Sequence, residues 1–161
     1  VAGNRITGEE SLKKKILIGS YGKWINKLLK KGGIKDKVIF LGSLNAEEMK
    51  ERYLKSNLYL SPSMMENSPN SVGEAMILGM PVVSSDVGGV TNLLSDKEEG
   101  FVYPSLDKEA LVNSICDAFA LNGSERQKEM GKAAARHANI THNPENNCRR
   151  LLEIYREIVN K

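Results

Sequence analysis

Short apolar runs alternate with amphipathic segments along most of this chain. The apolar runs are short and continuous, which is typical of strands buried on both faces of a parallel sheet. The segments between them place apolar residues at helical spacing and end at glycines or polar turns. The strands expected from this pattern cover residues 16–18, 38–41, 58–60, 81–85 and 100–103. The expected helices cover residues 23–31, a short segment after 45, 72–78, a short segment ending at 94, 107–121, 124–138 and 144–159.

This alternation predicts a doubly wound, Rossmann-like α/β domain, with a parallel sheet and helices on both of its faces. Right-handed crossovers connect the strands of such a sheet, and ligands bind beyond the carboxyl ends of the strands. Three loops are expected at that edge, at residues 42–45, 61–70 and 85–89. The middle loop carries the richest set of polar side chains.

Glu66 and Glu74 frame the predicted start of a helix near Pro69, with seven residues between them in the sequence. Glu66 then lies over the helix N-terminus, and Glu74 projects from about the second turn. The free backbone N–H groups between the two carboxylates can hold a phosphate, because the start of a helix carries partial positive charge. The carboxylates can accept hydrogen bonds from hydroxyl-rich groups on either side. This arrangement predicts a site for a nucleotide-sugar.

Composition and charge exclude several other classes of protein. A length of 161 residues, with 40% hydrophobic and 27% charged residues, is typical of one soluble globular domain. The formal net charge of +3 is too small to predict a nucleic-acid partner. Lysines gather at residues 13–15 and at 27, 30 and 31, which indicates a solvated helix face or, as the alternative, a face that meets anionic lipid headgroups.

The cysteines and histidines do not predict a metal site. Cys116, Cys148, His137 and His142 form none of the closely spaced pairs that a structural zinc site requires. No disulfide framework is visible either. The longest apolar run, at residues 75–83, is far too short to span a bilayer.

Several motifs follow one another in a fixed order between residues 38 and 103. They are Phe40-Leu41-Gly42, Ser61-Pro62-Ser63, Glu66 through Glu74-Ala75-Met76, and Gly79-Met80-Pro81-Val82-Val83-Ser84-Ser85-Asp86-Val87-Gly88-Gly89. The ordered set resembles the C-terminal, donor-binding half of a GT-B-fold retaining glycosyltransferase of family 4, within the glycosyl transferases group 1. The resemblance is strong over this region and looser over the rest of the chain.

The resemblance implies a role for each of the two carboxylates. Glu66 would contact hydroxyls of the donor sugar and stabilise an oxocarbenium-like transition state. Glu74 would accept hydrogen bonds from both ribose hydroxyls. Backbone N–H groups at residues 70–72 would hold the diphosphate, where the helix N-terminus favours the negative charge of the leaving group. The implied donor-binding residues are Ser43, Leu44, Asn67, Ser68, Asn70, Ser71, Val72 and Glu74, with the first two beside the base.

The implied donor is a UDP-, GDP- or ADP-sugar, bound without a metal or a further cofactor. Pro69 stands where many relatives have a residue with an N–H group, so one of their backbone contacts is absent here. The side chains of residues 67, 68 and 70 are open to a second reading as purely conformational turn residues. Asp86 either belongs to the site or only caps the helix that follows it.

The chain begins Val1-Ala2-Gly3-Asn4, without an initiator Met or a targeting segment. This start resembles the end of a strand cut from a longer protein. The expectation is therefore a single nucleotide-sugar-binding domain over residues 1–161, truncated at its N-terminal side. The family's basic Gly-Arg loop with its following Lys and the acceptor-binding domain would then be missing, and the fragment alone would be inactive.

The leading hypothesis is hexosyl transfer by the full-length protein, from the nucleotide-sugar to a carbohydrate or lipid-linked acceptor held by the missing domain. The expected setting is polysaccharide or glycan biosynthesis in the cytoplasm, with peripheral association at the inner face of the membrane as an alternative. A non-catalytic nucleotide- or sugar-binding module and a GT-B-fold sugar-nucleotide epimerase domain are the two competing hypotheses.

Overall fold

The computed structural model describes residues 20–160 of the chain. The strand predicted at residues 16–18 lies outside this described part. The chain divides into two compact units, Val1–Glu51 and Arg52–Lys161, and each unit is described by itself.

In the first unit, the described residues form one α-helix and a short 3-10 helix before a further helix begins. These elements are α2 (Ser20–Lys31), η1 (Lys35–Lys37) and the start of α3 (Ala46–Leu54). A capping box opens α3. The Asn45 side chain accepts a hydrogen bond from the Glu48 N–H group at 3.0 Å, and the Glu48 carboxylate accepts one from the Asn45 N–H group at 2.8 Å.

The second unit is built on a three-stranded parallel sheet in the order β1-β2-β3. The strands are β1 (Tyr59–Ser61), β2 (Val82–Ser85) and β3 (Phe101–Tyr103), so the predictions at 58–60, 81–85 and 100–103 are confirmed. The helices are α4 (Asn70–Ile77), α5 (Val90–Leu93), α6 (Lys108–Ala120), α7 (Glu125–Thr141) and α8 (Pro144–Val159). Because the strands are parallel and in register, their carboxyl ends share one edge of the sheet.

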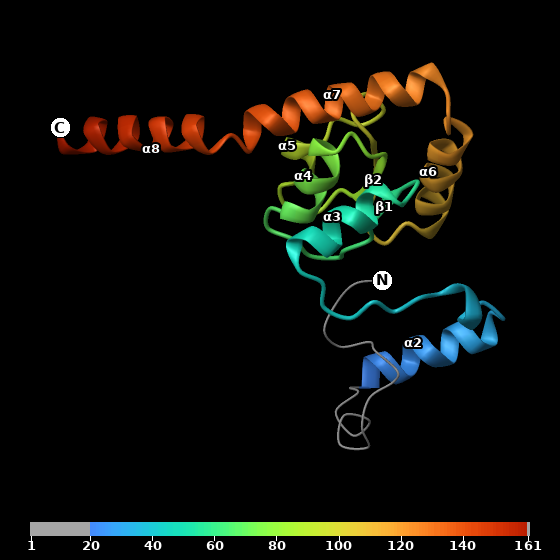
Figure 1. Ribbon diagram of the computed structural model, residues 1–161. Helices are drawn as coiled ribbons and strands as arrows, with labels where there is room; N and C mark the ends of the chain where they lie inside the picture. Colours follow the sequence, from blue (N-terminus) through green and yellow to red (C-terminus); the bar gives the residue numbers. More distant parts are fainter. Residues whose placement is uncertain (1–19, 161) are drawn as a thin grey trace. The chain divides into compact units, whose positions relative to one another are not determined.

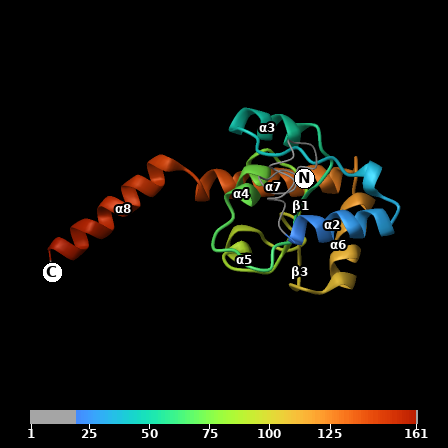
Figure 2. The same ribbon diagram turned by 90° about the horizontal axis from the view of Figure 1, so that it is seen from below.

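Helices cover both faces of this sheet, as the sequence predicts. Val83, Phe101 and Tyr103 lie on one face and pack with Ala118 of α6. On the other side, α4 contacts β1 and β2, and α7 lies along α4 (Figures 1 and 2). All the residues of β2 are buried, so the central strand is covered on both faces.

The strand predicted at residues 38–41 is wrong. Val38 has an extended backbone, but the segment belongs to no strand, and Ile39 is 70% exposed. An apolar run forms a strand only where a neighbouring strand completes its ladder of hydrogen bonds. The sheet that the described residues form consists of β1, β2 and β3 alone, and residues 38–41 are not among its strands.

The last helix, α8, differs from the others in its packing. None of its residues is buried, and Leu151, Leu152, Tyr155 and Ile158 are exposed. Among the helices that the structure describes, none is long and apolar enough to cross a membrane.

Candidate functional site

The loop after β1 holds Glu66 at the carboxyl edge of the sheet. The Ser63 hydroxyl donates a hydrogen bond of 2.6 Å to one carboxylate oxygen of Glu66, which is half-buried. The buried Ser85 hydroxyl, at the end of β2, donates a bond of 2.6 Å to the Ser63 carbonyl. Two successive hydrogen bonds, both involving Ser63, therefore connect the Glu66 carboxylate to the central strand.

The Gly88-Gly89 turn supports the same loop through its backbone. The Gly89 N–H group donates a hydrogen bond of 2.6 Å to the Asn67 carbonyl. Gly88 has a φ of +56°, and a Cβ at this position would overlap the Glu66 carbonyl group. Only glycine fits this close approach, so the contact with the turn fixes the position of the Glu66 backbone.

The start of α4 lacks a side-chain cap, and its first residue, Asn70, is exposed. The residue that precedes it is Pro69, which provides no capping side chain. The Val72 N–H group donates to the Pro69 carbonyl at 3.1 Å. In the described part of the chain, the N–H groups of Asn70 and Ser71 have no acceptor, which leaves two donors at the positive end of the helix.

The hydroxyl groups of Tyr53 and Tyr59 form hydrogen bonds with the first turns of α4. The Tyr53 hydroxyl lies 3.3 Å from both the Ser71 carbonyl and one carboxylate oxygen of Glu74. The Tyr59 hydroxyl donates a bond of 2.7 Å to the Ser71 hydroxyl. Glu74 is exposed, so its second carboxylate oxygen is available to a ligand.

Burial raises the pKa of Tyr53 well above its ordinary value, and the neighbouring Tyr59 and Glu74 raise it further. Tyr53 therefore remains a neutral hydrogen-bond donor to Glu74 at physiological pH.

The remaining sequence-predicted residues differ in their exposure and in the unit to which they belong. The side chains of Asn67, Ser68 and Asn70 are exposed and make no hydrogen bond within the described residues, so they do not act as side-chain caps. The Val72 side chain is fully buried in the core. Ser43 and Leu44 belong to the first unit, where Ser43 is exposed and Leu44 is half-buried.

Asp86 does not cap the helix that follows it, so this one of its two predicted roles is wrong. Its carboxylate accepts a hydrogen bond of 2.7 Å from the Ser105 N–H group, in the loop that leads to α6. The residue before α5 is Gly89, and no side chain caps that helix. This hydrogen bond joins the loop that follows β2 to the loop that follows β3.

Three residues of this edge received no individual role in the prediction from the sequence. Ser63 precedes Glu66 by three positions, a spacing that could have indicated a hydroxyl–carboxylate pair. Gly88 was noticed only as part of a family motif. Tyr53 lies 21 positions before Glu74, and no local pattern indicates that the two side chains meet.

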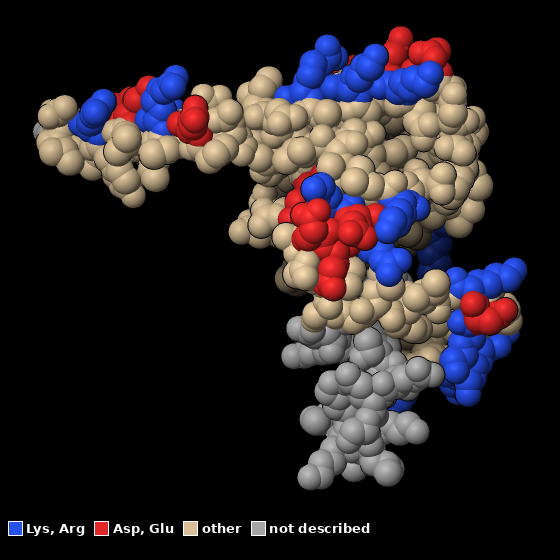
Figure 3. Space-filling view, viewed as in Figure 1, with Lys and Arg blue, Asp and Glu red and all other residues tan. Residues whose placement is uncertain are grey.

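The two loops at this edge of the second unit, 61–69 and 86–89, contain no Lys or Arg. Figure 3 shows Lys and Arg gathered instead along α7, whose basic residues are Arg126, Lys128, Lys132 and Arg136. In the part of the chain that the structure describes, no group of three His, Cys, Asp or Glu side chains is placed to hold a metal.

Solved structures with a similar fold are GT-B glycosyltransferases. Sucrose-phosphate synthase from Thermosynechococcus elongatus matches with a TM-score of 0.79 and 25% identity, over 98% of this chain and 38% of that one. Anabaena HepE, crystallised with UDP-glucose, has a TM-score of 0.67 and 20% identity, over 86% of this chain and 35% of its own. The second likeness shows the fold alone. The fold is that of the C-terminal half of a GT-B enzyme.

Curated relatives lead to the family. The D-inositol 3-phosphate glycosyltransferase of Streptomyces avermitilis is 31% identical over 71% of this chain and 24% of its own length. The amylovoran biosynthesis glycosyltransferase AmsK of Erwinia amylovora is 34% identical over 50% and 21%. The chain spans only 21% to 24% of these two proteins. The family model for glycosyl transferases group 1 matches residues 5–137, and the chain belongs to this family.

Replacing Gly88 with Ala should displace the Glu66 loop. Ala at Gly88 adds a Cβ that overlaps the Glu66 carbonyl group, in a backbone conformation that already costs Ala about 1 kcal/mol. The free energy of unfolding, measured with urea, should fall by about 2 kcal/mol or more, and the amide NMR signals of Glu66 and Asn67 should shift. Gly123→Ala is the matched control, because Gly123 also has positive φ but nothing lies within 4 Å of its added Cβ. Equal losses of stability in the two variants, with unmoved Glu66 signals, would contradict this support.

The raised pKa of Tyr53 predicts a loss of stability at high pH. Unfolded Tyr53 loses its proton near pH 10, while folded Tyr53 keeps it, so above about pH 10 the folded state binds more protons. The free energy of unfolding should therefore fall as pH rises through this range. Tyr53→Phe should reduce the slope without removing it, because burial also raises the pKa of Tyr103. Urea unfolding at several pH values tests this, with exposed Tyr155→Phe as control, and equal slopes in both variants would refute it.

Proposed function

We propose that this chain binds the nucleotide-sugar donor of a retaining glycosyltransferase, at the edge where β1 and β2 end. The observation that supports this most is the uncapped start of α4. There, the unpaired N–H groups of Asn70 and Ser71 stand between the carboxylates of Glu66 and Glu74 in the sequence. The same short segment thus offers donors for a diphosphate and acceptors for hydroxyl groups.

The diphosphate is proposed to lie at the start of α4. Its oxygens would accept hydrogen bonds from the two free N–H groups, and the helix dipole would stabilise their negative charge. When the sugar leaves, negative charge grows on this diphosphate. The donors are already in place at that moment, so they stabilise the transition state without reorganisation.

Glu66 is proposed to act on the sugar side of the bond that breaks. The Ser63 hydroxyl occupies one of its carboxylate oxygens and fixes its orientation. The other oxygen would accept a hydrogen bond from a sugar hydroxyl, and its negative charge would stabilise the positive charge that develops on the sugar ring. Positive charge would then develop on the sugar ring beside Glu66, and negative charge on the diphosphate beside the start of α4. Each charge would be stabilised by a neighbouring group of opposite sign.

Glu74 is proposed to bind the ribose of the donor. Tyr53 holds one of its carboxylate oxygens and leaves the other free, so an exposed carboxylate is presented in a defined direction. Ser43 and Leu44 are proposed to line the base. Asn67 and Ser68, with exposed side chains beside Glu66, complete the proposed donor-binding set.

The acceptor and the pathway are further parts of the proposal. Membership of the group 1 family favours sugar transfer over an epimerase or a non-catalytic module. HepE, a structural neighbour, binds UDP-glucose, and AmsK belongs to a polysaccharide pathway. We therefore propose hexosyl transfer from a UDP-, GDP- or ADP-sugar, without a metal, to a carbohydrate or lipid-linked acceptor held by a separate domain. Cytoplasmic polysaccharide or glycan biosynthesis, with peripheral membrane association as an option, is the proposed setting.

Removing one N–H group from α4 tests the diphosphate site. Asn70→Pro deletes a free donor at the first helical position, where proline fits the helix and Pro69 already has an extended backbone. Dissociation constants for UDP, GDP and ADP, measured by NMR on the ¹⁵N-labelled chain, should rise about tenfold for whichever nucleotide binds. Asn70→Ala, which keeps the N–H group, is the matched control and should bind as the unchanged chain does. A chain in which none of the three nucleotides shifts the Ser71 or Glu74 signals would overturn the proposed site.

The proposed role of Glu66 predicts a loss of turnover in the intact enzyme. Glu66→Gln keeps an oxygen for the Ser63 bond but removes the negative charge beside the sugar, so kcat should fall at least about 100-fold. The dissociation constant of the nucleotide diphosphate should change little, because Glu66 contacts the sugar. Glu129→Gln, at an exposed position of α7, is the control for loss of one carboxylate. A kcat within a few-fold of that of the unchanged enzyme would rule out this role.

A further inference from the structure

A cavity lies near the amino ends of β1 and β2, at the edge of the sheet opposite to the proposed donor site. Its volume is about 340 Å³, at the small end of the range of small-molecule sites. Asn57 and Pro81, which stand just before the two strands, are among its lining residues. The nucleotide-sugar site proposed above lies at the carboxyl ends of the same strands, so the two sites are separate.

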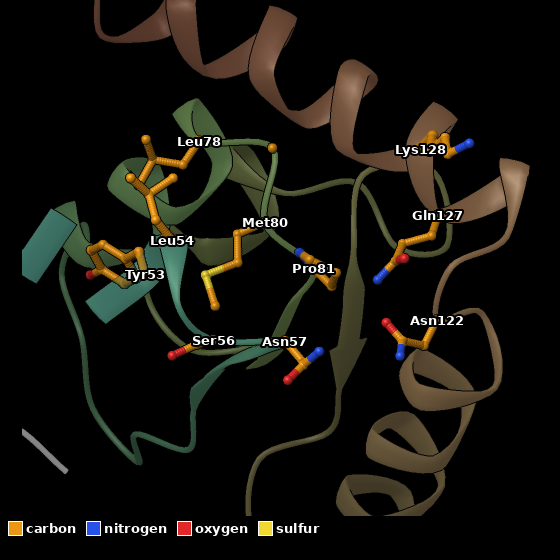
Figure 4. A pocket seen from close by; sticks show the side chains of 11 residues that line it. Tyr53, Leu54, Ser56, Asn57, Leu78, Met80, Pro81, Asn122, Gln127 and Lys128 are labelled. Atoms are coloured by element: carbon orange, nitrogen blue, oxygen red, sulfur yellow. The ribbon is translucent and has the colours of Figure 1, made fainter. Parts of the chain in front are cut away.

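Side-chain amides supply the polar part of this cavity. Figure 4 shows Asn122 and Gln127 on one side, with Asn57 between them and the apolar residues. The amides of Asn57 and Asn122 make no hydrogen bond within the described residues. The oxygen of the Gln127 amide accepts a bond of 2.8 Å from the Gly123 N–H group, which fixes the side chain and leaves its NH₂ group as a donor.

The opposite wall is apolar and carries no charge. Tyr53, Leu54 and Leu78 form this side, and Met80 lies between them and Pro81 (Figure 4). Among the described residues that line the cavity, Lys128 alone is charged, and its ammonium group is paired with Glu125 at 2.6 Å. The lining therefore presents no unpaired charge to a ligand, which disfavours a phosphate or carboxylate.

We propose that this cavity binds a neutral, polyhydroxylated ring compound, that is, one saccharide unit. A carboxamide donates through its NH₂ group and accepts through its oxygen, and each sugar hydroxyl does both, so Asn57, Asn122 and Gln127 match neighbouring hydroxyls. The C–H face of a sugar ring matches Leu54 and Met80. The ligand is bound apart from the donor edge, so the proposal does not depend on the donor site.

Side-chain NH₂ signals allow a direct test in the ¹⁵N-labelled chain of 161 residues. Glucose, galactose, mannose, N-acetylglucosamine and maltose are added separately, and inorganic phosphate is added as an anionic comparison. At least one sugar should shift the NH₂ signals of Asn57, Asn122 and Gln127 in a saturable manner, whereas phosphate should not. Shifts from phosphate but from no sugar, or sugar shifts confined to Asn70 and Ser71, would overturn the proposal.

Matched variants then localise the binding. Asn57→Ala together with Asn122→Ala should raise the sugar's dissociation constant at least about tenfold, because two hydrogen-bonding groups are lost. Neither side chain has an internal hydrogen bond and both are exposed, so the fold should be retained. Asn113→Ala, at an exposed position of α6 outside the cavity, should leave the dissociation constant unchanged. Equal affinity in the double variant and the control would also overturn the proposal.

Discussion

The parallel pairing of β1 with β2 is the constraint on which the carboxyl edge of the second unit depends. It places the end of β1 beside the end of β2, with Ser61 opposite Ser84. Because the strands run in the same direction, the loops that leave them emerge side by side. The Ser85 hydroxyl can then reach the Ser63 carbonyl, and Gly88 can pass under Glu66. An antiparallel pair would send these loops to opposite edges, and neither contact would form.

Contacts made to its backbone carbonyl groups, rather than packing of its own side chains, position the Glu66 loop. Gly89 bonds to the Asn67 carbonyl, Gly88 lies against the Glu66 carbonyl, and Ser85 bonds to the Ser63 carbonyl. None of these contacts uses the side chains of Asn67 or Ser68, which are exposed. The course of the loop therefore does not depend on the side chains of the two residues that follow Glu66.

Most elements of the second unit were predictable, because each is encoded by a local pattern. The apolar run at 81–85 and the helix expected from residue 107 are examples, and in the structure the Asp107 side chain caps α6 by accepting hydrogen bonds from the Glu109 and Ala110 N–H groups. The run at 38–41 failed because an apolar segment alone does not contain the neighbour that makes it a strand. Glu66 and Glu74 were found through their spacing around a helix start. Tyr53 and the Asp86–Ser105 bond were not, because they join residues that are distant in sequence.

Tyr53 connects regions that the sheet otherwise keeps apart. Its ring forms part of the cavity near the amino ends of the strands, while its hydroxyl lies 3.3 Å from Glu74 at the start of α4. An aromatic side chain is rigid beyond its two rotatable bonds, so the ring and the hydroxyl move together. A tilt of the ring on one side of the unit therefore changes the distance from the hydroxyl to the carboxylate on the other. One rigid side chain, that of Tyr53, thus contacts both the cavity and the Glu74 carboxylate.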